Sequence, residues 1–236
     1  MLIAGITKVR NESEIIVDTL DHFAEHCDAI FVYDDASTDN TAELCLNHPA
    51  VQAVTKGNHW DPNREKAEWQ SRQAALVTAQ AHSPEWILCF DADERVEMPE
   101  FDMDRYDAVR MKLFDFYITG EDIDLPYTKR RWIGPEYREI LMMYRNRPGM
   151  RFQYPDQREM QLRGNVRMLR DGYVKHYGKA ISVEEWERTV DYYMKWPKYR
   201  KKWKARRGKA IHTKSDFGRP LILWEERDLY GLRLAP

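Results

Sequence analysis

Short apolar runs alternate with longer amphipathic segments over the first ninety residues. The apolar runs are residues 2–7, 29–33, 51–54 and 86–90, each of a length typical of a buried strand. The segments between them predict helices over residues 11–24, from about 37 to 46, and 64–81. Strands that alternate with helices in this way predict βαβ units and a parallel sheet.

The pattern changes after residue 94. Residues 106–113 alternate as a half-exposed strand does, and residues 140–144, 167–169 and 172–174 are further candidate strands, whereas residues 120–135 read as irregular. Ser182-Val183-Glu184-Glu185 has the form of a capping box and predicts a helix to about Trp196. We therefore expect an α/β fold with a mostly parallel central sheet flanked by helices, a small antiparallel addition and a C-terminal basic helical extension.

Polar residues follow three of the predicted strands: Thr7, Asp34-Asp35 and Asp91-Ala92-Asp93. Parallel strands present such groups at one edge of the sheet, where ligands bind. Two carboxylates spaced i and i+2 suit a divalent cation that also contacts substrate phosphates. Asp34-Asp35 alone, or Asp91 with Asp93 alone, would also fit an acidic turn at the end of a strand. Both pairs in one chain favour a binding site. The first strand lacks a Gly-x-Gly-x-x-Gly turn, which argues against a dinucleotide enzyme.

Three strings together resemble the successive signatures of glycosyltransferase family 2, whose members have the GT-A fold. They are residues 3–12, residues 32–41 and residues 90–94. The likeness covers about residues 1–115; beyond that, residues 173–178 are similar to a His-containing segment of the family. The resemblance implies a Rossmann-like GT-A sheet and an inverting, metal-dependent enzyme. Such an enzyme moves a sugar from a nucleoside-diphosphate-sugar donor to a hydroxyl of a glycan or a lipid-linked acceptor.

The resemblance also implies roles for single residues. Thr7 and either Asp34 or Asp35 would hold the nucleoside, with Asp35 preferred for the base, and Arg72 would lie near the nucleotide. The remaining roles concern the ribose and the metal: Asp91 would face the ribose, and Asp93, Asp91 and His176 would bind Mn²⁺ or Mg²⁺ beside the diphosphate. For Arg72 a solvated helix face, and for His176 a structural role, remain alternatives.

An inverting transfer also needs a general base for the acceptor hydroxyl. In the family this acid comes well after the metal motif. Glu159 is the preferred candidate, followed by Asp156 and then by the pair Glu121-Asp122, and each could equally be a surface acid. The departing diphosphate gains negative charge, so cations fixed beside it would accelerate the reaction.

The net charge of -2 over 236 residues hides an asymmetry. Residues 195–209 hold nine Lys or Arg and no acid, and aromatic residues are interleaved from residue 191 onward. This stretch predicts peripheral contact with an anionic membrane, although a solvated arm or a protein interface would also fit. We expect no nucleic-acid partner. Three scattered cysteines, and no apolar run long enough to span a bilayer, predict a cytoplasmic protein.

We expect a catalytic domain over residues 1–190, divided near 115 into a nucleotide half and an acceptor half, and an extension over residues 191–236. Two other functions remain open. A nucleotidyltransferase would carry a glycine-rich basic loop after the first strand, and residues 7–11 contain no glycine. A non-catalytic nucleotide-binding module with a basic tail is disfavoured by the intact Asp91 and Asp93.

Overall fold

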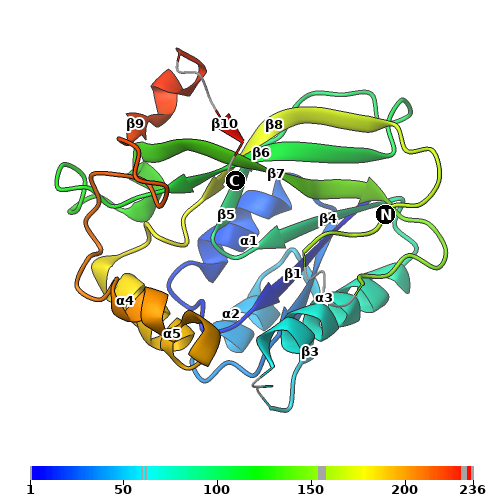
Figure 1. Cartoon of the computed structure of the whole chain (residues 1–236). Helices are drawn as coiled ribbons and strands as arrows, with labels where there is room; N and C mark the ends of the chain where they lie inside the picture. The colour runs from blue at the N-terminus through cyan, green and yellow to red at the C-terminus, as the bar shows by residue number, and fades with distance from the viewer. Residues whose placement is uncertain (1, 60, 62, 154–157, 230–232, 235–236) are drawn as a thin grey trace. The chain divides into compact units, whose positions relative to one another are not determined.

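The computed structural model describes residues 2–59, 61, 63–153, 158–229 and 233–234 (Figure 1). The chain forms two compact units. The first unit contains residues 1–111 and 140–172, and the second contains residues 112–139 and 173–236. The division falls within three strands, β6 (Ala108–Phe116), β7 (Trp132–Arg145) and β8 (Met168–His176), so each unit holds part of each.

The sheet of the first unit has a parallel half. Strands β1 (Ile3–Val9), β2 (Ala29–Asp34), β3 (Val51–Lys56) and β4 (Trp86–Asp91) lie parallel in the order β3-β2-β1-β4. The order continues through β7, which is antiparallel to β4, and then β6, β8 and β5 (Glu94–Glu97). The predicted fold class, a mostly parallel sheet with a small antiparallel addition, is confirmed.

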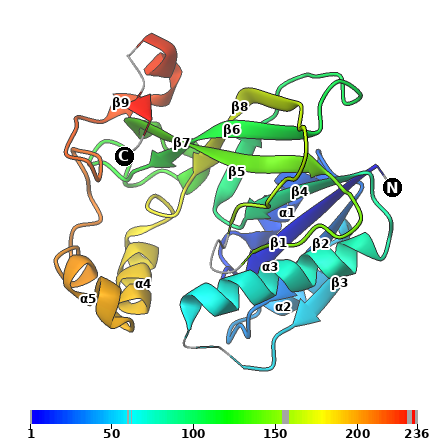
Figure 2. The same ribbon diagram turned by 45° about the vertical axis from the view of Figure 1, so that its right-hand side comes forward.

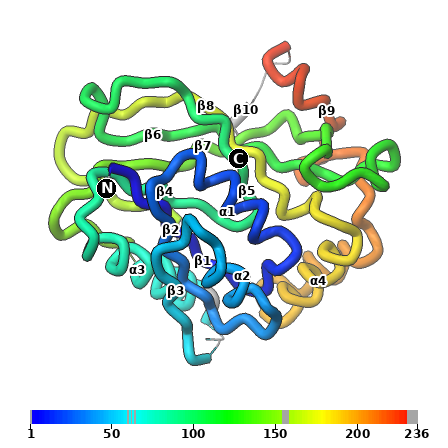
Figure 3. The backbone as a smooth tube through the Cα atoms, turned by 180° about the vertical axis from the view of Figure 1, so that it is seen from behind, coloured from blue at the N-terminus to red at the C-terminus, as the bar shows by residue number. Residues whose placement is uncertain are grey.

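Helices cover this parallel half. These are α1 (Ile16–Ala24), α2 (Thr41–Asn47) and α3 (Arg64–Gln80); Figure 2 shows α3 lying along β1 and β2, and Figure 3 shows α1 beside α2. Leu76 of α3 packs with Ile87 of β4 in one core cluster, whereas Phe23 of α1 stacks on Phe90 with ring centroids 3.7 Å apart. Strand β4 is therefore buried on both faces, which explains its continuous apolar run.

The second unit has its own core. Phe114 and Phe116 of β6 pack with Tyr177 and with Trp224 of a 3-10 helix, η2 (Trp224–Leu229). A shorter 3-10 helix, η1 (Tyr127–Lys129), precedes β7, and two-residue strands β9 (Ile222–Leu223) and β10 (Arg233–Leu234) pair with β7. Strand β7 begins eight residues before the predicted strand. The predicted irregular segment is wrong from Trp132 onward, because these residues belong to β7, which also pairs with β9 and β10 from the far end of the chain.

The basic stretch folds as the end of α4 (Val183–Met194) followed by α5 (Pro197–Lys204). Ser182 caps α4 as predicted, since its hydroxyl accepts a hydrogen bond from the Glu185 amide at 3.0 Å. Trp203 is buried, and its ring stacks on Tyr193 with centroids 4.4 Å apart. Helix α4 continues through residue 190, and the expected domain boundaries at 115 and 190 stay predictions. Among the described helices, none is long and apolar enough to cross a bilayer.

Candidate nucleotide-binding site

Three parallel strands of the first unit end at one edge of the sheet, as the sequence predicts. Lys8 of β1 lies in register with both Tyr33 of β2 and Asp91 of β4, and Val9 lies in register with Asp34. Thr7, one residue earlier, is paired in register with Val32 and Phe90. The polar residues at the ends of β1, β2 and β4 therefore come together at the edge where parallel sheets bind ligands.

The turn after β2 is held rigidly. Arg10 donates hydrogen bonds to the backbone carbonyls of Asp35 and Ala36, the latter at 3.0 Å. The side chain of Asn11 accepts a hydrogen bond from the Thr38 amide at 2.8 Å. Ala36 and Asn11 have φ values of 53° and 54°, a left-handed conformation that is costly for residues other than glycine. These contacts fix the backbone on which Asp34 and Asp35 are mounted.

Two buried oxygens at this edge lack partners. Thr7 Oγ1 and one carboxylate oxygen of Asp34, Oδ1, make no hydrogen bond with any residue that the structure describes. Thr7 is 2% exposed and Asp34 is 3% exposed. Leaving a buried polar atom unpaired costs about 1–3 kcal/mol, so such atoms point to a ligand or an ordered water. Asp35 is also buried, and this burial raises the pKa of its carboxyl group despite the positive charges of Lys8 and Arg10.

Asp91 lies between two guanidinium groups. Its Oδ1 accepts a hydrogen bond from Arg72 Nη2 at 2.6 Å, and its Oδ2 lies 2.8 Å from Arg158 Nη1. The second nitrogen of Arg158, Nη2, donates to Glu94 Oε2 at 2.7 Å. Burial alone would raise the pKa of Asp91, but Arg158 and Arg72 outweigh it and hold this pKa below its usual range. Arg72 Nε is buried without a hydrogen-bond acceptor among the described residues.

Lys8 connects the two halves of the site. Its Nζ lies 3.6 Å from Glu68 Oε1 on α3, and its positive charge lowers the pKa of both Asp35 and Asp91. Acids that would receive a nucleoside and cations that would receive a diphosphate thus share one electrostatic environment in the first unit.

Two of the predicted metal ligands, Asp91 and His176, contact other side chains within their own units. Both oxygens of Asp91 face guanidinium groups, and Asp93 lies in the turn between β4 and β5. His176 belongs to the second unit, where its Nδ1 lies 2.5 Å from Asp115 Oδ1. The described part of the chain contains no cluster of three His, Cys, Asp or Glu side chains able to hold a metal ion. The metal-binding roles of Asp91, Asp93 and His176 stay predictions, and within the first unit two arginines provide the positive charge beside Asp91.

The candidate bases have other partners or lie outside the described residues. Both carboxylate oxygens of Glu159 accept hydrogen bonds from Arg110, and its Oε1 also accepts one from the Leu141 amide at 3.1 Å. Asp122 is fully buried and accepts hydrogen bonds from the Thr119 amide and hydroxyl. Asp156 lies outside the described residues. The catalytic roles of Glu159 and Asp156 stay predictions, and the contacts of Glu159 are those of a structural residue.

Sequence reasoning missed Arg158, Lys8 and Glu94. Lys8 follows Thr7 directly, and Glu94 follows the Asp91-Ala92-Asp93 motif, so proximity to these motifs was a usable signal for both. Arg158 carries no local signal, because its partner Asp91 is far away in the sequence.

No protein-family model matches this chain. Uncharacterized proteins of Mycobacterium tuberculosis and Mycobacterium bovis are each 32% identical to it over 146 residues. This match covers 60% of this chain and 33% of theirs, so the chain spans about a third of the length of the curated relatives it matches.

Solved structures of low similarity include S. aureus TarS in complex with UDP, at 15% identity and a TM-score of 0.44, over 82% of this chain and 66% of that chain. Another is the glucosyl-3-phosphoglycerate synthase of Mycobacterium tuberculosis in complex with Mn²⁺ and UDP-glucose, at 18% identity and a TM-score of 0.31, over 53% and 46%. The predicted likeness to nucleotide-sugar transferases is found among these structures. Similarity at these TM-scores and identities establishes no activity for this chain.

Proposed function

We propose that this chain is a glycosyltransferase that moves a sugar from a nucleoside-diphosphate-sugar donor to a hydroxyl group of a glycan or a lipid-linked acceptor. One observation carries the proposal: unpaired buried oxygens of Thr7 and Asp34 lie at the same sheet edge as the Arg72–Asp91–Arg158 cluster. The oxygens of Thr7 and Asp34 offer hydrogen-bond acceptors for a nucleoside. The guanidinium groups of Arg72 and Arg158 offer positive charge for a diphosphate.

In this proposal the rigid turn after β2 binds the nucleoside. Asp34 and Asp35 accept hydrogen bonds from base N–H or ribose O–H groups, and the Thr7 hydroxyl gains the partner that it lacks. Arg10 and Asn11 hold the backbone of this turn in place. Binding then costs less conformational entropy.

Arg72 and Arg158 receive the diphosphate. As the bond from the sugar to the diphosphate breaks, negative charge grows on the departing oxygen, and guanidinium groups fixed nearby stabilise that charge more than they stabilise the intact donor. Asp91 orients both guanidinium groups in the absence of donor. The N–H group of Arg72 Nε, which has no acceptor among the described residues, supplies a donor for a phosphate oxygen without breaking that contact.

Two features of the proposal come from the family resemblance, namely inversion at the sugar and use of Mn²⁺ or Mg²⁺. Inversion requires an acid to accept the proton of the acceptor hydroxyl. The resemblance offers Glu159 and Asp156 for this role, and Arg110 already engages Glu159. Turnover in Mn²⁺, in Mg²⁺ and in EDTA decides the metal requirement independently of donor binding.

Contact with an anionic membrane through residues 191–209 belongs to the proposal as well. Lys198, Lys201, Lys202 and Lys204 are exposed on α5, whereas Trp203 is turned inward against Trp186. The contact would therefore depend on charge and weaken with salt, at about 1 kcal/mol per cation near the surface. Sedimentation with phosphatidylserine vesicles tests it.

Thermal-shift measurements with UDP-, GDP- and dTDP-sugars test donor binding. At a ligand concentration one hundred times Kd, the fold gains about 2.7 kcal/mol, which raises Tm by roughly 5–10 °C in a chain of this length. Release of nucleoside diphosphate from the best donor then tests transfer. Release of pyrophosphate from a nucleoside triphosphate and a sugar phosphate would instead establish a nucleotidyltransferase. If no nucleoside-diphosphate sugar shifts Tm, the proposal is wrong.

A further inference from the structure

The first unit contains a cavity of about 260 Å³ at the edge of the sheet opposite to Asp91. It lies between residues 145–153, which follow β7, and residues 161–166, which precede β8. Among the described residues that line it are four arginines, Arg145, Arg147, Arg151 and Arg163, and one acid, Asp107. The lining thus carries a formal charge of +3 in a chain whose net charge is -2.

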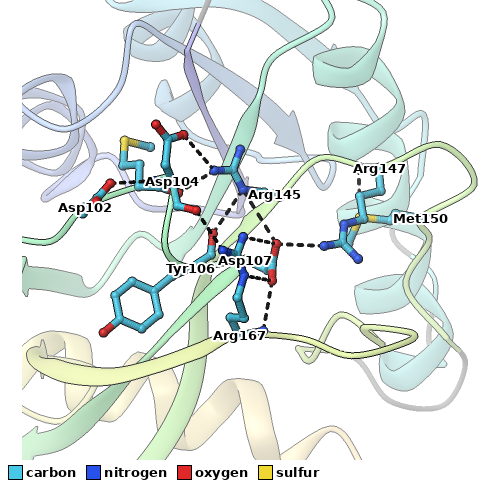
Figure 4. Close-up of polar contacts among 9 residues, drawn as sticks. Asp102, Asp104, Tyr106, Asp107, Arg145, Arg147, Met150 and Arg167 are labelled. Carbon is cyan, nitrogen blue, oxygen red and sulfur yellow. Dashed lines mark hydrogen bonds and ion pairs between the residues drawn. The ribbon is translucent and has the colours of Figure 1, made fainter.

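Asp107 organises the arginines but does not neutralise them (Figure 4). Its Oδ1 accepts a hydrogen bond from Arg147 Nη2 at 2.8 Å, its Oδ2 accepts one from Arg167 Nε at 3.0 Å, and Arg145 Nε lies 3.8 Å away. Arg167, through its side-chain and backbone hydrogen bonds, holds the pKa of Asp107 below its usual range. One negative charge is therefore shared among three guanidinium groups, and Arg145 is fixed further by a hydrogen bond to the Tyr106 carbonyl at 3.1 Å.

Three of the four arginines that line the cavity are exposed to solvent. The side chain of Arg147 is 45% exposed, and Arg151 and Arg163 are exposed without an ion pair to any described residue. The cavity also has an apolar lining formed by Met150, Leu162 and Val166, which pack against the core cluster beside α3. A cationic rim above an apolar floor suits an anionic group attached to a small organic body.

We propose that this cavity binds a small phosphorylated molecule, with its phosphate bound by Arg147, Arg151 and Arg163 and its organic part on Met150, Leu162 and Val166. Arginine forks match phosphate oxygens in pairs, and several guanidinium groups lining one cavity favour a dianion over a single carboxylate. The volume lies just below the usual range of about 300–1,000 Å³ for small-molecule pockets, so the ligand is small.

This site is separate from the nucleotide-binding edge. Arg145 lies in register with Trp86 at the start of β4, whereas Asp91 is the last residue of the same strand. Five residue steps of roughly 3.3 Å place the two strand ends about 17 Å apart. A single phosphate group cannot contact both.

Isothermal titration of the full chain with phenyl phosphate, and with inorganic phosphate to isolate the anion, tests the proposal. We expect Arg147→Met and Arg163→Met each to raise the Kd for phenyl phosphate about tenfold, since each removes a charged hydrogen-bond donor. Arg105→Met, which removes an exposed arginine of the same unit outside the cavity, should leave Kd unchanged. Arg72→Met should also leave it unchanged, because Arg72 belongs to the nucleotide-binding edge.

Three results would overturn the proposal: absence of binding in the folded wild-type chain, equal weakening by Arg105→Met, or loss of binding through Arg72→Met alone. The last result would assign the probe to the nucleotide-binding edge instead. Unfolding midpoints measured by circular dichroism establish that each variant is folded. If Arg147→Met unfolds, because Asp107 loses a partner, the exposed Arg163 still decides the question, and Arg163→Lys should restore part of the affinity.

Discussion

Asp91→Asn tests the charge balance on which the proposed donor site depends. Asp91 is the acid between Arg72 and Arg158, and Arg72 is 4% exposed. Asparagine keeps the size of the side chain but removes its negative charge. The variant therefore leaves two guanidinium groups close together, with only Glu94 remaining to balance Arg158.

Removing one partner of a fully buried ion pair costs about 3–5 kcal/mol. The Asp91 side chain is 32% exposed, and Glu94 compensates in part, so we expect a smaller loss of about 2–3 kcal/mol. In a chain of this length that loss lowers Tm by roughly 5–10 °C. Asp104→Asn is the matched control, because Asp104 forms an ion pair with Arg145 while its side chain is 98% exposed. It should leave the unfolding midpoint unchanged.

The effect of Asp91→Asn should also depend on pH. Arg158 and Arg72 hold the pKa of Asp91 below its usual value despite burial. The contribution of this carboxylate to stability is therefore present above the unfolded-state pKa of about 3.9 and is lost as the pH falls toward the folded-state pKa. Urea unfolding at pH 7, 5 and 3.5 measures this contribution. The difference between wild type and variant should be constant from pH 7 to 5 and should shrink below about pH 4.

A double-mutant cycle with Arg158→Met separates the ion pair from general disruption. The two substitutions together should cost less than the sum of their separate costs, since the double variant leaves one fewer uncompensated charge. Equal stability of Asp91→Asn and wild type at pH 7, or strict additivity in the cycle, would show that the guanidinium groups do not depend on Asp91.

Other substitutions test the unpaired hydroxyl, the backbone and the helix cap. Thr7→Val should leave the free energy of unfolding unchanged or raise it by up to about 1 kcal/mol, since the lost hydroxyl has no partner, while calorimetry should record weaker binding of nucleoside diphosphates. Gly172→Ala should destabilise the fold by more than about 1 kcal/mol in urea, because φ is +86° and the new Cβ would lie 2.7 Å from Pro99 Cδ; Gly164→Ala, with φ +82° and open space around it, should cost less. Ser182→Ala should remove about 1 kcal/mol through loss of the α4 cap, and unchanged urea midpoints would contradict that role.

Local patterns predicted most elements of the first unit and the start of α4 in the second. The five apolar residues of 86–90 lie in β4, which is buried on both faces, and the capping-box form at Ser182 marks the start of α4. Strand β7 was predicted only over its last residues, and its earlier part also pairs with β9 and β10, more than eighty residues later in the chain. Gly134 and Pro135 lie in this earlier part and are more typical of a turn.

The site was predicted less completely than the fold. The strand ends identified Thr7, Asp34, Asp35 and Asp91, since parallel strands align at one edge without any tertiary detail. Side-chain partners follow no such rule. Glu159 is held by a residue of β6, and Arg158 comes to Asp91 from a segment outside the parallel half of the sheet.

The aromatic residues of the basic stretch illustrate the same limit. Their spacing suggested a surface that contacts a membrane. In the structure Trp203 instead packs on Trp186 and Tyr193 inside the pair formed by α4 and α5. Composition cannot distinguish an aromatic face that meets a partner from one that is covered by its own neighbouring helix.

The most direct test of the central claim compares a nucleoside diphosphate with its nucleoside by isothermal titration in EDTA. The nucleotide is whichever of UDP, GDP or dTDP gives the largest thermal shift. We predict that the wild-type chain binds both ligands. Arg158→Met should raise the Kd of the nucleoside diphosphate about tenfold or more and leave the Kd of the nucleoside unchanged. Equal weakening of both ligands, or absence of binding by the folded wild-type chain, would contradict the assignment of this sheet edge to a nucleoside-diphosphate sugar.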